Sequence, residues 1–179
     1  MRIDVTLLVR GLNKLSVDEA PAALQLPELR EAGASEAKAR ADVPPGATFS
    51  GLVHAELRVN CDKESFLLDA ELSCPAELEC GRCLNWYPSM VEASFRSFVR
   101  RGEGPVAHGN FEEQMDEGGV VYHAGHYLDL SEAVREALLV TVPMRPLCKE
   151  DCRGLCVGCG ADLNHETCRC ASAQGTRAS

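Results

Sequence analysis

Six of the ten cysteines lie close together near the end of the 179-residue sequence, within residues 148–170. Two of them form the unit Cys156-x-x-Cys159, and Gly160 follows directly. This unit is typical of a zinc knuckle, in which two thiolates approach one ion and the glycine adopts a left-handed backbone conformation. A second pair of thiolates completes the tetrahedral four-sulfur set of a structural zinc site. We therefore predict a first zinc site formed by Cys156, Cys159, Cys168 and Cys170.

The segment 147–170 is poor in large apolar side chains. Its candidates for burial are Leu147, Leu155, Val157 and Leu163. Ordering a segment of this length costs far more conformational entropy than four such side chains return. A structural zinc ion contributes folding free energy directly, and docking on the rest of the chain would add to it. We expect 147–170 to be a zinc-binding segment docked on a body formed by residues 1–146.

Cys80-x-x-Cys83 is a second cysteine pair, and alone it is half of a metal site. Such a pair can be redox-active, it can be structural, or it can share an ion with Cys148 and Cys152. Those two are the C-terminal cysteines that remain once the first site is assigned. We therefore expect one zinc ion and leave open a second, held by Cys80, Cys83, Cys148 and Cys152.

The remaining cysteines and one nearby histidine are interpreted without a metal. Cys74 lies on the apolar side of an alternating segment, and free cysteines are among the most buried residues. We interpret Cys61 and Cys74 as buried thiols. His165 lies between Cys159 and Cys168, but its spacing does not match a zinc knuckle. We interpret it as an exposed loop residue.

Two catalytic interpretations compete with a structural role. His54-x-Glu56, followed later by a C-x-x-C pair, resembles the signature of zinc nucleobase deaminases, although glutamate replaces the proline expected before the cysteines. The run Cys152-x3-Cys156-x2-Cys159 spells the iron–sulfur motif of enzymes that cleave S-adenosylmethionine, which need a larger barrel. A closed four-thiolate zinc site leaves no position for a substrate. We therefore expect no enzymatic activity and no small-molecule substrate.

Composition limits the cellular setting and the partners. The sequence begins without a charged and then apolar leader, and no run approaches the roughly 18 apolar residues of a membrane span. We therefore expect a cytoplasmic protein with no membrane partner, in which the cysteines stay reduced. The net charge is −9 at pH 7 and the basic residues are scattered, which disfavours bare nucleic acid. A basic protein, or a basic protein already bound to RNA, suits this charge better.

Apolar residues alternate with polar ones through much of the first hundred residues. This period of two predicts strands at 3–10, 48–59, 64–80 and 87–99. We expect Gly11 to end the first strand and the 64–80 strand to bend or break near Pro75. One or two short helices, interrupted by proline, are expected at 18–32. A run ending in Pro-Pro-Gly predicts a linker or insertion at 34–46.

The sequence after the predicted meander changes character. Residues 102–119 are glycine-rich and acidic and predict a loop, followed by a short strand at 120–122. Asp129, with a glutamate three residues later, begins a helix predicted at 130–140. Residues 171–179 are expected to be a disordered tail. The predicted fold class is α+β: an antiparallel β meander or partly open barrel, covered by a helix and followed by the cysteine-rich zinc-binding segment.

These motifs, in this order, resemble the YceD family, known as large ribosomal RNA subunit accumulation proteins of bacteria and plastids. The matching motifs are Cys80-Gly-Arg82-Cys83-Leu84, Leu128-Asp129-Leu130, Pro146-Leu147-Cys148, Cys152-x-Gly154-Leu155-Cys156-x-x-Cys159-Gly160-x-x-Leu163-Asn164 and Cys168-x-Cys170. The resemblance implies a role in the synthesis, processing or stability of large-subunit (23S) ribosomal RNA, with no known catalytic activity.

The partner that we expect is a basic ribosomal protein or a large-subunit assembly intermediate, and direct contact with RNA stays open. Two other functions are kept as alternatives. One is a zinc-dependent nucleobase-modifying enzyme. The other is a zinc-stabilised protein-interaction module with no link to the ribosome.

Overall fold

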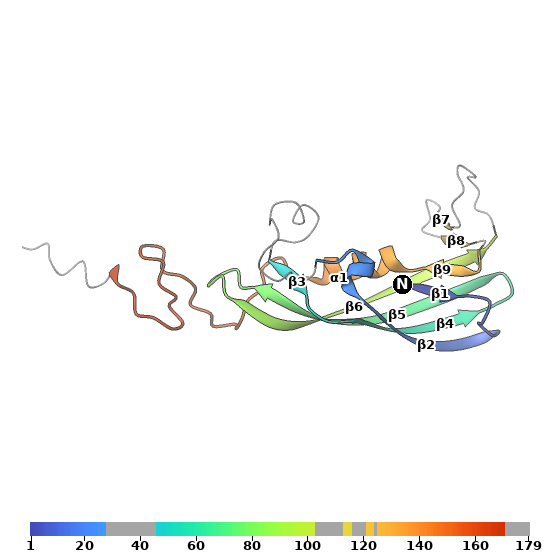
Figure 1. Cartoon of the computed structure of the whole chain (residues 1–179), viewed down its shortest axis with the longest axis horizontal. Coiled ribbons are helices and arrows are strands. Elements are labelled where there is room, and N and C mark those ends of the chain that lie inside the picture. Colours follow the sequence, from blue (N-terminus) through green and yellow to red (C-terminus); the bar gives the residue numbers. More distant parts are fainter. Residues whose placement is uncertain (28–45, 103–112, 116–120, 124, 171–179) are drawn as a thin grey trace, which may run out of the picture.

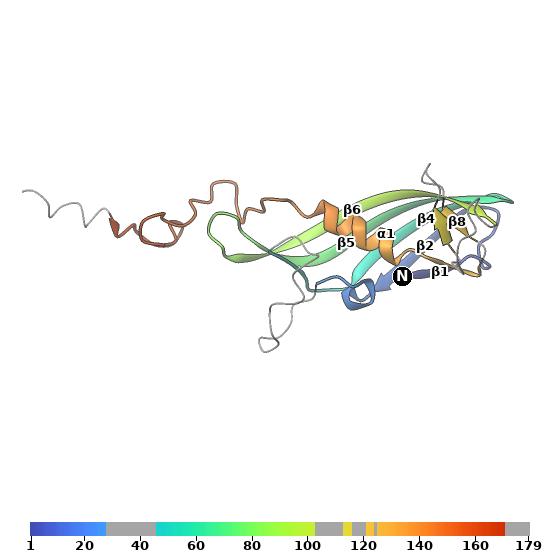
Figure 2. The ribbon, with the colours of Figure 1, turned by 90° about the horizontal axis from the view of Figure 1, so that it is seen from above.

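The computed structural model describes residues 1–27, 46–102, 113–115, 121–123 and 125–170. Its centre is a curved sheet of long strands with one α-helix lying across the concave face (Figures 1 and 2). The strands are β1 (Arg2–Asp4), β2 (Gly11–Glu19), β3 (Ala47–Phe49), β4 (Val53–Cys61), β5 (Ser65–Glu79), β6 (Trp86–Arg101), β7 (Glu113–Met115), β8 (Val121–His123) and β9 (Tyr127–Asp129), and the helices are the 3-10 helix η1 (Pro21–Leu24) and α1 (Ser131–Thr141). The predicted fold class is confirmed: a mostly antiparallel sheet curls into a half-barrel with one α-helix. Among the described residues, no helix has the length and hydropathy to span a membrane.

Strands β4, β5 and β6 form the antiparallel meander that the alternation predicts. Every second side chain of β4 and β5 is buried, as expected for a sheet with one covered face. The sheet order is β2-β4-β5-β6-β8-β7, with β3 pairing with β5 and β8 parallel to β6. Strands β5 and β6 pair without interruption from Ser65↔Arg100 to Glu79↔Trp86. This long hairpin carries the turn 80–85 past α1 toward the C-terminal segment (Figures 1 and 2).

Helix α1 lies close to its predicted position and packs its apolar side against the sheet. Val134 and Leu138 are fully buried. Asp129 precedes the helix, and its carboxylate accepts the Ser131 N–H at 2.9 Å and the Arg2 Nε–H at 2.8 Å. Burial alone would raise the pKa of Asp129, but these bonds outweigh it and lower this pKa to about 2. The carboxylate therefore fastens the start of the helix while ionised.

The N-terminal strand is shorter than predicted. Strand β1 ends at Asp4 instead of continuing to residue 10, because the Asp4 carboxylate accepts the Thr6 N–H at 2.9 Å and turns the chain. Gly11, with φ +100°, begins β2 rather than ending a strand. The prediction of a strand over 3–10 was therefore wrong beyond Asp4.

The prediction of one or two short helices at 18–32 is right only in part, because residues 21–24 form the 3-10 helix η1 whereas residues 18–19 belong to β2. Residues 11–19 form β2 and pair with the whole of β4, because Leu15 and Val17 alternate with polar residues and pack against the core. Long-range pairing thus overrides Asp18 as a possible helix N-cap. The 3-10 helix η1 is the short helical turn that remains. Residues 28–45, which include most of the predicted linker, lie outside the described residues.

The predicted break near Pro75 occurs in the neighbouring strand rather than in β5. Strand β4 pairs with β5 as far as Ser73, and β3 pairs with it from Ala76 onwards. Pro75 lies opposite the gap, where its missing N–H is not needed, and its carbonyl accepts the Ser50 N–H at 2.9 Å. The single strand predicted at 48–59 is therefore two strands, while β5 is continuous.

Two short strands lie between β6 and β9. Strand β8 corresponds to the strand predicted at 120–122. Strand β7 pairs with β8 inside the segment predicted as a loop at 102–119, so that prediction was wrong at 113–115. The rest of that segment from 103 onwards and the predicted tail at 171–179 lie outside the described residues.

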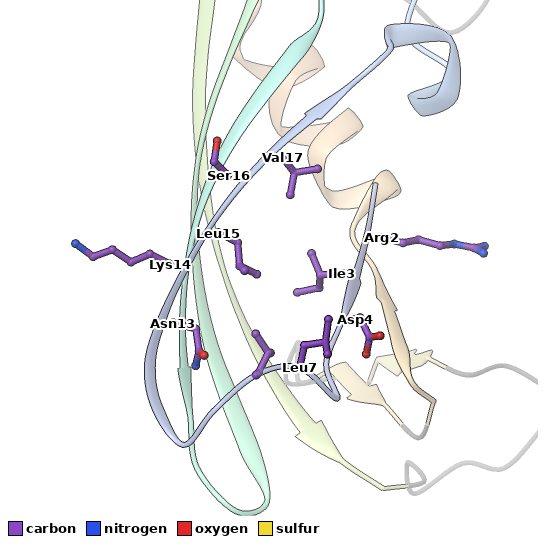
Figure 3. A pocket seen from close by; sticks show the side chains of 10 residues that line it. Arg2, Ile3, Asp4, Leu7, Asn13, Lys14, Leu15, Ser16 and Val17 are labelled. Atoms are coloured by element: carbon purple, nitrogen blue, oxygen red, sulfur yellow. The ribbon is translucent and has the colours of Figure 1, made fainter.

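The half-barrel is open along one seam, between β1 and β2. Strand β1 pairs with β9 instead of β2, so two strand edges face each other. Ile3, Leu15 and Val17 point into the space between them, a pocket of about 300 Å³ (Figure 3). The barrel is therefore partly open, as predicted.

Candidate metal centres

The structure gathers eight of the ten cysteines into two groups of four. We call Cys80, Cys83, Cys148 and Cys152 the hairpin tetrad, and Cys156, Cys159, Cys168 and Cys170 the C-terminal tetrad. Within each tetrad the four sulfur atoms all lie within 4.8 Å of one another. The structure thus brings together the same cysteines that the spacing assigned to one another, including the second set that the sequence left open. In both tetrads the possible metal donors are cysteine sulfur atoms only.

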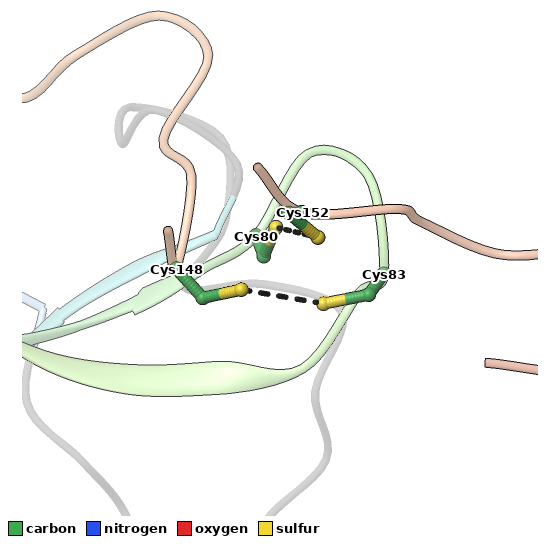
Figure 4. Close-up of side chains that lie close together, drawn as sticks. All are labelled: Cys80, Cys83, Cys148 and Cys152. Atoms are coloured by element: carbon green, nitrogen blue, oxygen red, sulfur yellow. Dashed lines mark hydrogen bonds between the residues drawn. The ribbon is translucent and has the colours of Figure 1, made fainter. Parts of the chain in front are cut away.

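The hairpin tetrad joins two parts of the chain that are distant in sequence. Cys80 and Cys83 lie in the turn between β5 and β6, and Cys148 and Cys152 lie in the segment after α1 (Figure 4). The Cys80–Cys152 and Cys83–Cys148 sulfur separations are both 3.7 Å. A tetrahedron with metal–sulfur bonds of about 2.3 Å has edges of about 3.8 Å. The donor set therefore fits a four-thiolate zinc site.

The C-terminal tetrad is formed within the segment 156–170. The Cys156 sulfur lies 3.2 Å from that of Cys168 and 3.9 Å from that of Cys170. Gly160 has φ +72°, which confirms the left-handed glycine predicted after the C-x-x-C unit. A Cβ atom at Gly158 would lie 2.6 Å from the Cys170 sulfur, so this glycine makes room for a ligand atom. These features are typical of a zinc knuckle.

The two tetrads differ in burial. Cys80, Cys83 and Cys152 are buried, and Tyr87 and Leu147 pack against them. All four cysteines of the C-terminal tetrad are partly or fully exposed. The hairpin tetrad is therefore part of the folded interior, whereas the C-terminal tetrad organises a segment at the surface.

Backbone N–H groups lower the pKa of one thiol in each tetrad and so favour its thiolate form. Burial raises the pKa of the Cys80 thiol, but the N–H groups of Cys148, Cys83 and Arg82 outweigh it and lower this pKa to about 6. The N–H groups of Ala161 and Arg169 lower the pKa of Cys159 to about 6 in the same way. Thiolates that accept such bonds are the form that binds metals.

A further thiol in each tetrad resists ionisation. Burial and the neighbouring sulfur atoms raise the pKa of Cys148 to about 12. The neighbouring Cys159, Cys156 and Cys168 sulfur atoms raise the pKa of Cys170 to about 12. Four thiolates this close together repel one another, so all four can ionise only around a cation. Both tetrads could therefore hold a metal ion.

Arg82 and Asn85 fix the C-terminal segment to the hairpin, and Asn164 braces the segment internally. The sequence motifs contained Arg82 and Asn164 without assigning them a role. The Arg82 guanidinium donates to the carbonyl oxygens of Cys152 at 2.9 Å and Glu150 at 3.2 Å. The Arg82 carbonyl in turn accepts a backbone N–H at 3.0 Å from the segment. Asn164 donates to the Cys152 sulfur at 3.4 Å, and Asn85 donates to a carboxylate in the segment at 2.8 Å.

The residues interpreted as metal-free lie outside both tetrads. Cys61 and Cys74 are buried, as predicted. Burial raises the pKa of Cys74 to about 11. The His165 side chain is 76% exposed and belongs to neither tetrad, which agrees with its interpretation as a loop residue.

The structure separates the residues on which both catalytic interpretations depend. His54 pairs across the sheet with Ser73, and Cys80 lies seven residues further along the chain, about 23 Å away at about 3.3 Å per residue. The deaminase interpretation requires these groups at one ion. Cys152 belongs to the hairpin tetrad, whereas Cys156 and Cys159 belong to the other. The three cysteines of the iron–sulfur motif are therefore divided between two sites.

Fold and site together define a class: a half-barrel protein whose central hairpin and C-terminal segment are joined by closely spaced cysteines. The family described as large ribosomal RNA subunit accumulation protein YceD matches residues 68–177. The chain belongs to this family. The matched stretch contains all eight cysteines of the two tetrads.

Individual relatives are more distant. A Mycobacterium tuberculosis protein is 27% identical over 115 residues, covering 64% of this chain and 53% of that protein. A Mycobacterium leprae protein is 25% identical over 111 residues, covering 62% and 49%. The chloroplastic large ribosomal RNA subunit accumulation protein YCED homolog 1 of Zea mays is 26% identical over 133 residues, covering 60% and 45%. The chain thus spans about half the length of these curated relatives. No solved structure matches the chain with comparable significance.

Proposed function

We propose that this protein is a non-enzymatic factor that supports the synthesis, processing or stability of large-subunit ribosomal RNA during ribosome assembly. The observation that carries the proposal is the family match over residues 68–177, which includes every cysteine of both tetrads. The name of the maize relative refers to the same process. The stretch that carries the family likeness therefore also carries both candidate metal centres.

We further propose that each tetrad holds one zinc ion. The separations of 3.7 Å in the hairpin tetrad and the all-thiolate donor sets support zinc. The ion would supply the positive charge that lets four neighbouring thiols ionise together. Four protein ligands fill a tetrahedral zinc ion, so no position is left for water or substrate. This closed coordination supports a structural role and a non-enzymatic function.

The partner that suits the chain is a basic ribosomal protein or an RNA–protein intermediate of the large subunit, met in the cytoplasm. The net charge of −9 favours such a partner over bare RNA. Direct contact with RNA is not required by the proposal.

Depletion of the protein from its host tests the function. Large-subunit ribosomal RNA and free large subunits should fall relative to their small-subunit counterparts. The full chain and Cys61→Ala, which removes a thiol outside both tetrads, should restore them, whereas Cys83→Ser should not. Unchanged ribosomal RNA and precursor particles after depletion would overturn the proposal and favour an interaction module unrelated to the ribosome.

Elemental mass spectrometry of the purified full chain tests the metal. Two zinc ions per chain are expected, and a mercurial reagent should release them in step with its titration of the tetrad thiols. Cys61→Ala should leave the zinc content unchanged, because that thiol belongs to neither tetrad. One zinc ion would contradict a zinc ion in each tetrad, and iron would contradict zinc in both.

A further inference from the structure

One end of the β5–β6 hairpin presents an exposed surface on the side of the sheet that faces away from α1. Trp86 and Met90 point outward from β6 with 45% and 56% of their surface exposed, and Pro88 between them is also exposed. Glu79 lies directly opposite Trp86 and Glu77 directly opposite Pro88 on β5. We call this surface the hairpin face and define it by Glu77, Glu79, Trp86, Pro88, Met90 and Glu92.

The charge of the hairpin changes along its length. Residues 71–79 and 86–94, next to the turn, contain four glutamates and no lysine or arginine. Residues 65–70 and 95–101, at the other end, contain one aspartate and three arginines. The basic residues of the two strands are therefore gathered away from the turn, and Arg82 within the turn donates to backbone carbonyls of the C-terminal segment. The charged strand residues at the end that carries the exposed tryptophan are all glutamates.

Among the described residues, no counter-charge pairs with the carboxylates of the hairpin face. Arg58 and Arg96, on the same side of the sheet, pair with Glu71 and Asp69. Within the part of the chain that the structure describes, no ion pair involves the three glutamates of the hairpin face. Acids further from the turn are thus neutralised by the protein itself, whereas these three are left for an external cation.

We propose that the hairpin face binds an extended basic segment of a partner protein. This inference rests on the proposed function and specifies the chemistry of its partner. A lysine or arginine placed over the Trp86 ring gains a cation–π interaction. Directly opposite residues in an antiparallel pair have Cβ atoms about 5 Å apart, so the same cation reaches the Glu79 carboxylate. Pro88 and Met90 provide apolar contact beside it.

An extended chain suits the spacing of this surface. Trp86, Pro88, Met90 and Glu92 follow one another at every second position of a strand, about 6.6 Å apart. A partner segment in an extended conformation repeats its side chains with the same period. RNA is the less suitable occupant, because its phosphates would meet three unpaired carboxylates.

A fluorescently labelled, lysine- and arginine-rich peptide and the zinc-loaded full chain provide the direct test. The peptide should bind, and added salt should weaken its binding. The double variant Glu77→Gln/Glu79→Gln should weaken it about five- to thirtyfold, because two ion pairs with the peptide are lost. Trp86→Leu should also weaken it. Glu64→Gln provides the matched control, because it removes an exposed charge just before the far end of β5 and should change binding less than about twofold.

Three outcomes would overturn the inference. These are an equal loss in Glu64→Gln and in the double variant, unchanged binding in Trp86→Leu, or tighter binding of a single-stranded RNA than of the peptide. Expression of the double variant in depleted cells separates this inference from the proposed function. Normal ribosomal RNA with the double variant would refute the role of the hairpin face while leaving the function intact. Normal ribosomal RNA in depleted cells without any rescue would refute the function itself.

Discussion

Replacing one cysteine in each tetrad should have very different effects on the stability of the half-barrel. The hairpin tetrad connects Cys83 to Cys148, 65 positions along the chain. Closing a loop of that length in the unfolded chain costs about 4 kcal/mol of conformational free energy. The folded half-barrel already holds the two ends together, so a metal ion binds the folded chain about a thousandfold more tightly than the unfolded chain. By linkage, the ion stabilises the half-barrel by the same amount.

Metal binding at the C-terminal tetrad should not stabilise the half-barrel in this way. Its widest loop, from Cys156 to Cys170, spans 14 positions and contains no strand or helix of the half-barrel. Its metal should therefore order the segment locally and leave the unfolding of the half-barrel unchanged. Cys83→Ser should lower the free energy of unfolding by about 4 kcal/mol, whereas Cys159→Ser should change it by less than about 0.5 kcal/mol.

Urea unfolding followed by far-ultraviolet circular dichroism provides the assay, with a chromophoric chelator present to report zinc release. In the wild-type chain, one zinc ion should be released together with loss of the sheet signal, while the second should follow its own curve. Cys61→Ala controls for loss of a thiol as such. Equal destabilisation by Cys83→Ser and Cys159→Ser, or a loss below about 1 kcal/mol in Cys83→Ser, would refute the loop-closure reasoning.

Four further substitutions, one of them a comparison, test the surrounding structure. Gly154→Ala should speed zinc release from the hairpin tetrad, because the added Cβ would lie 2.9 Å from the Arg82 carbonyl oxygen. Gly160 has a similar positive φ, but a Cβ added there would meet no atom within 4 Å, so Gly160→Ala should speed this release less. The ionised Asp129 carboxylate stabilises the fold above its ordinary pKa of 3.8, and this stabilisation is lost as the pH falls to the folded-state pKa of about 2. In Asp129→Asn, the free energy of unfolding should therefore fall less between pH 4 and pH 2 than in the wild-type chain. Leu138→Ala should lower the urea midpoint by the equivalent of about 2–5 kcal/mol, the cost of a cavity at a fully buried leucine. An unchanged midpoint would contradict the packing of α1.

The sequence predicts this protein best where a repeated pattern meets a strict chemical requirement. Alternation over β4, β5 and β6 and the spacing of eight cysteines are such patterns, and the structure agrees with both. The helix predicted to start at residue 18 fails there because a possible N-cap at Asp18 is a local signal, whereas the pairing of β2 with β4 is decided by packing far along the chain. The roles of Arg82 and Asn85 were equally inaccessible, since they depend on where the C-terminal segment crosses the hairpin.

The position of the hairpin tetrad connects the metal to the proposed binding surface. Near the turn, β5 and β6 extend past α1, and among the described strands only the short β3 pairs with them there. Narrow ribbons of strands are marginally stable on their own. The tetrad fastens this end of the hairpin through Cys80, which directly follows Glu79, and through Cys83, which lies shortly before Trp86. Two residues of the hairpin face therefore flank the turn that the tetrad holds.

Removal of the metal should therefore weaken binding at a surface that contains no metal ligand. Chelation would loosen the 80–85 turn and let the Glu79–Trp86 pair fray, since it is the last pair of the β5–β6 ladder before the turn. Basic-peptide binding should fall in Cys83→Ser and in chelated wild-type chain, and stay unchanged in Cys159→Ser, whose tetrad does not hold the hairpin. Full peptide affinity in the chelated chain would show that binding at the hairpin face does not depend on the metal. In that case the tetrad would stabilise the fold without maintaining the binding site.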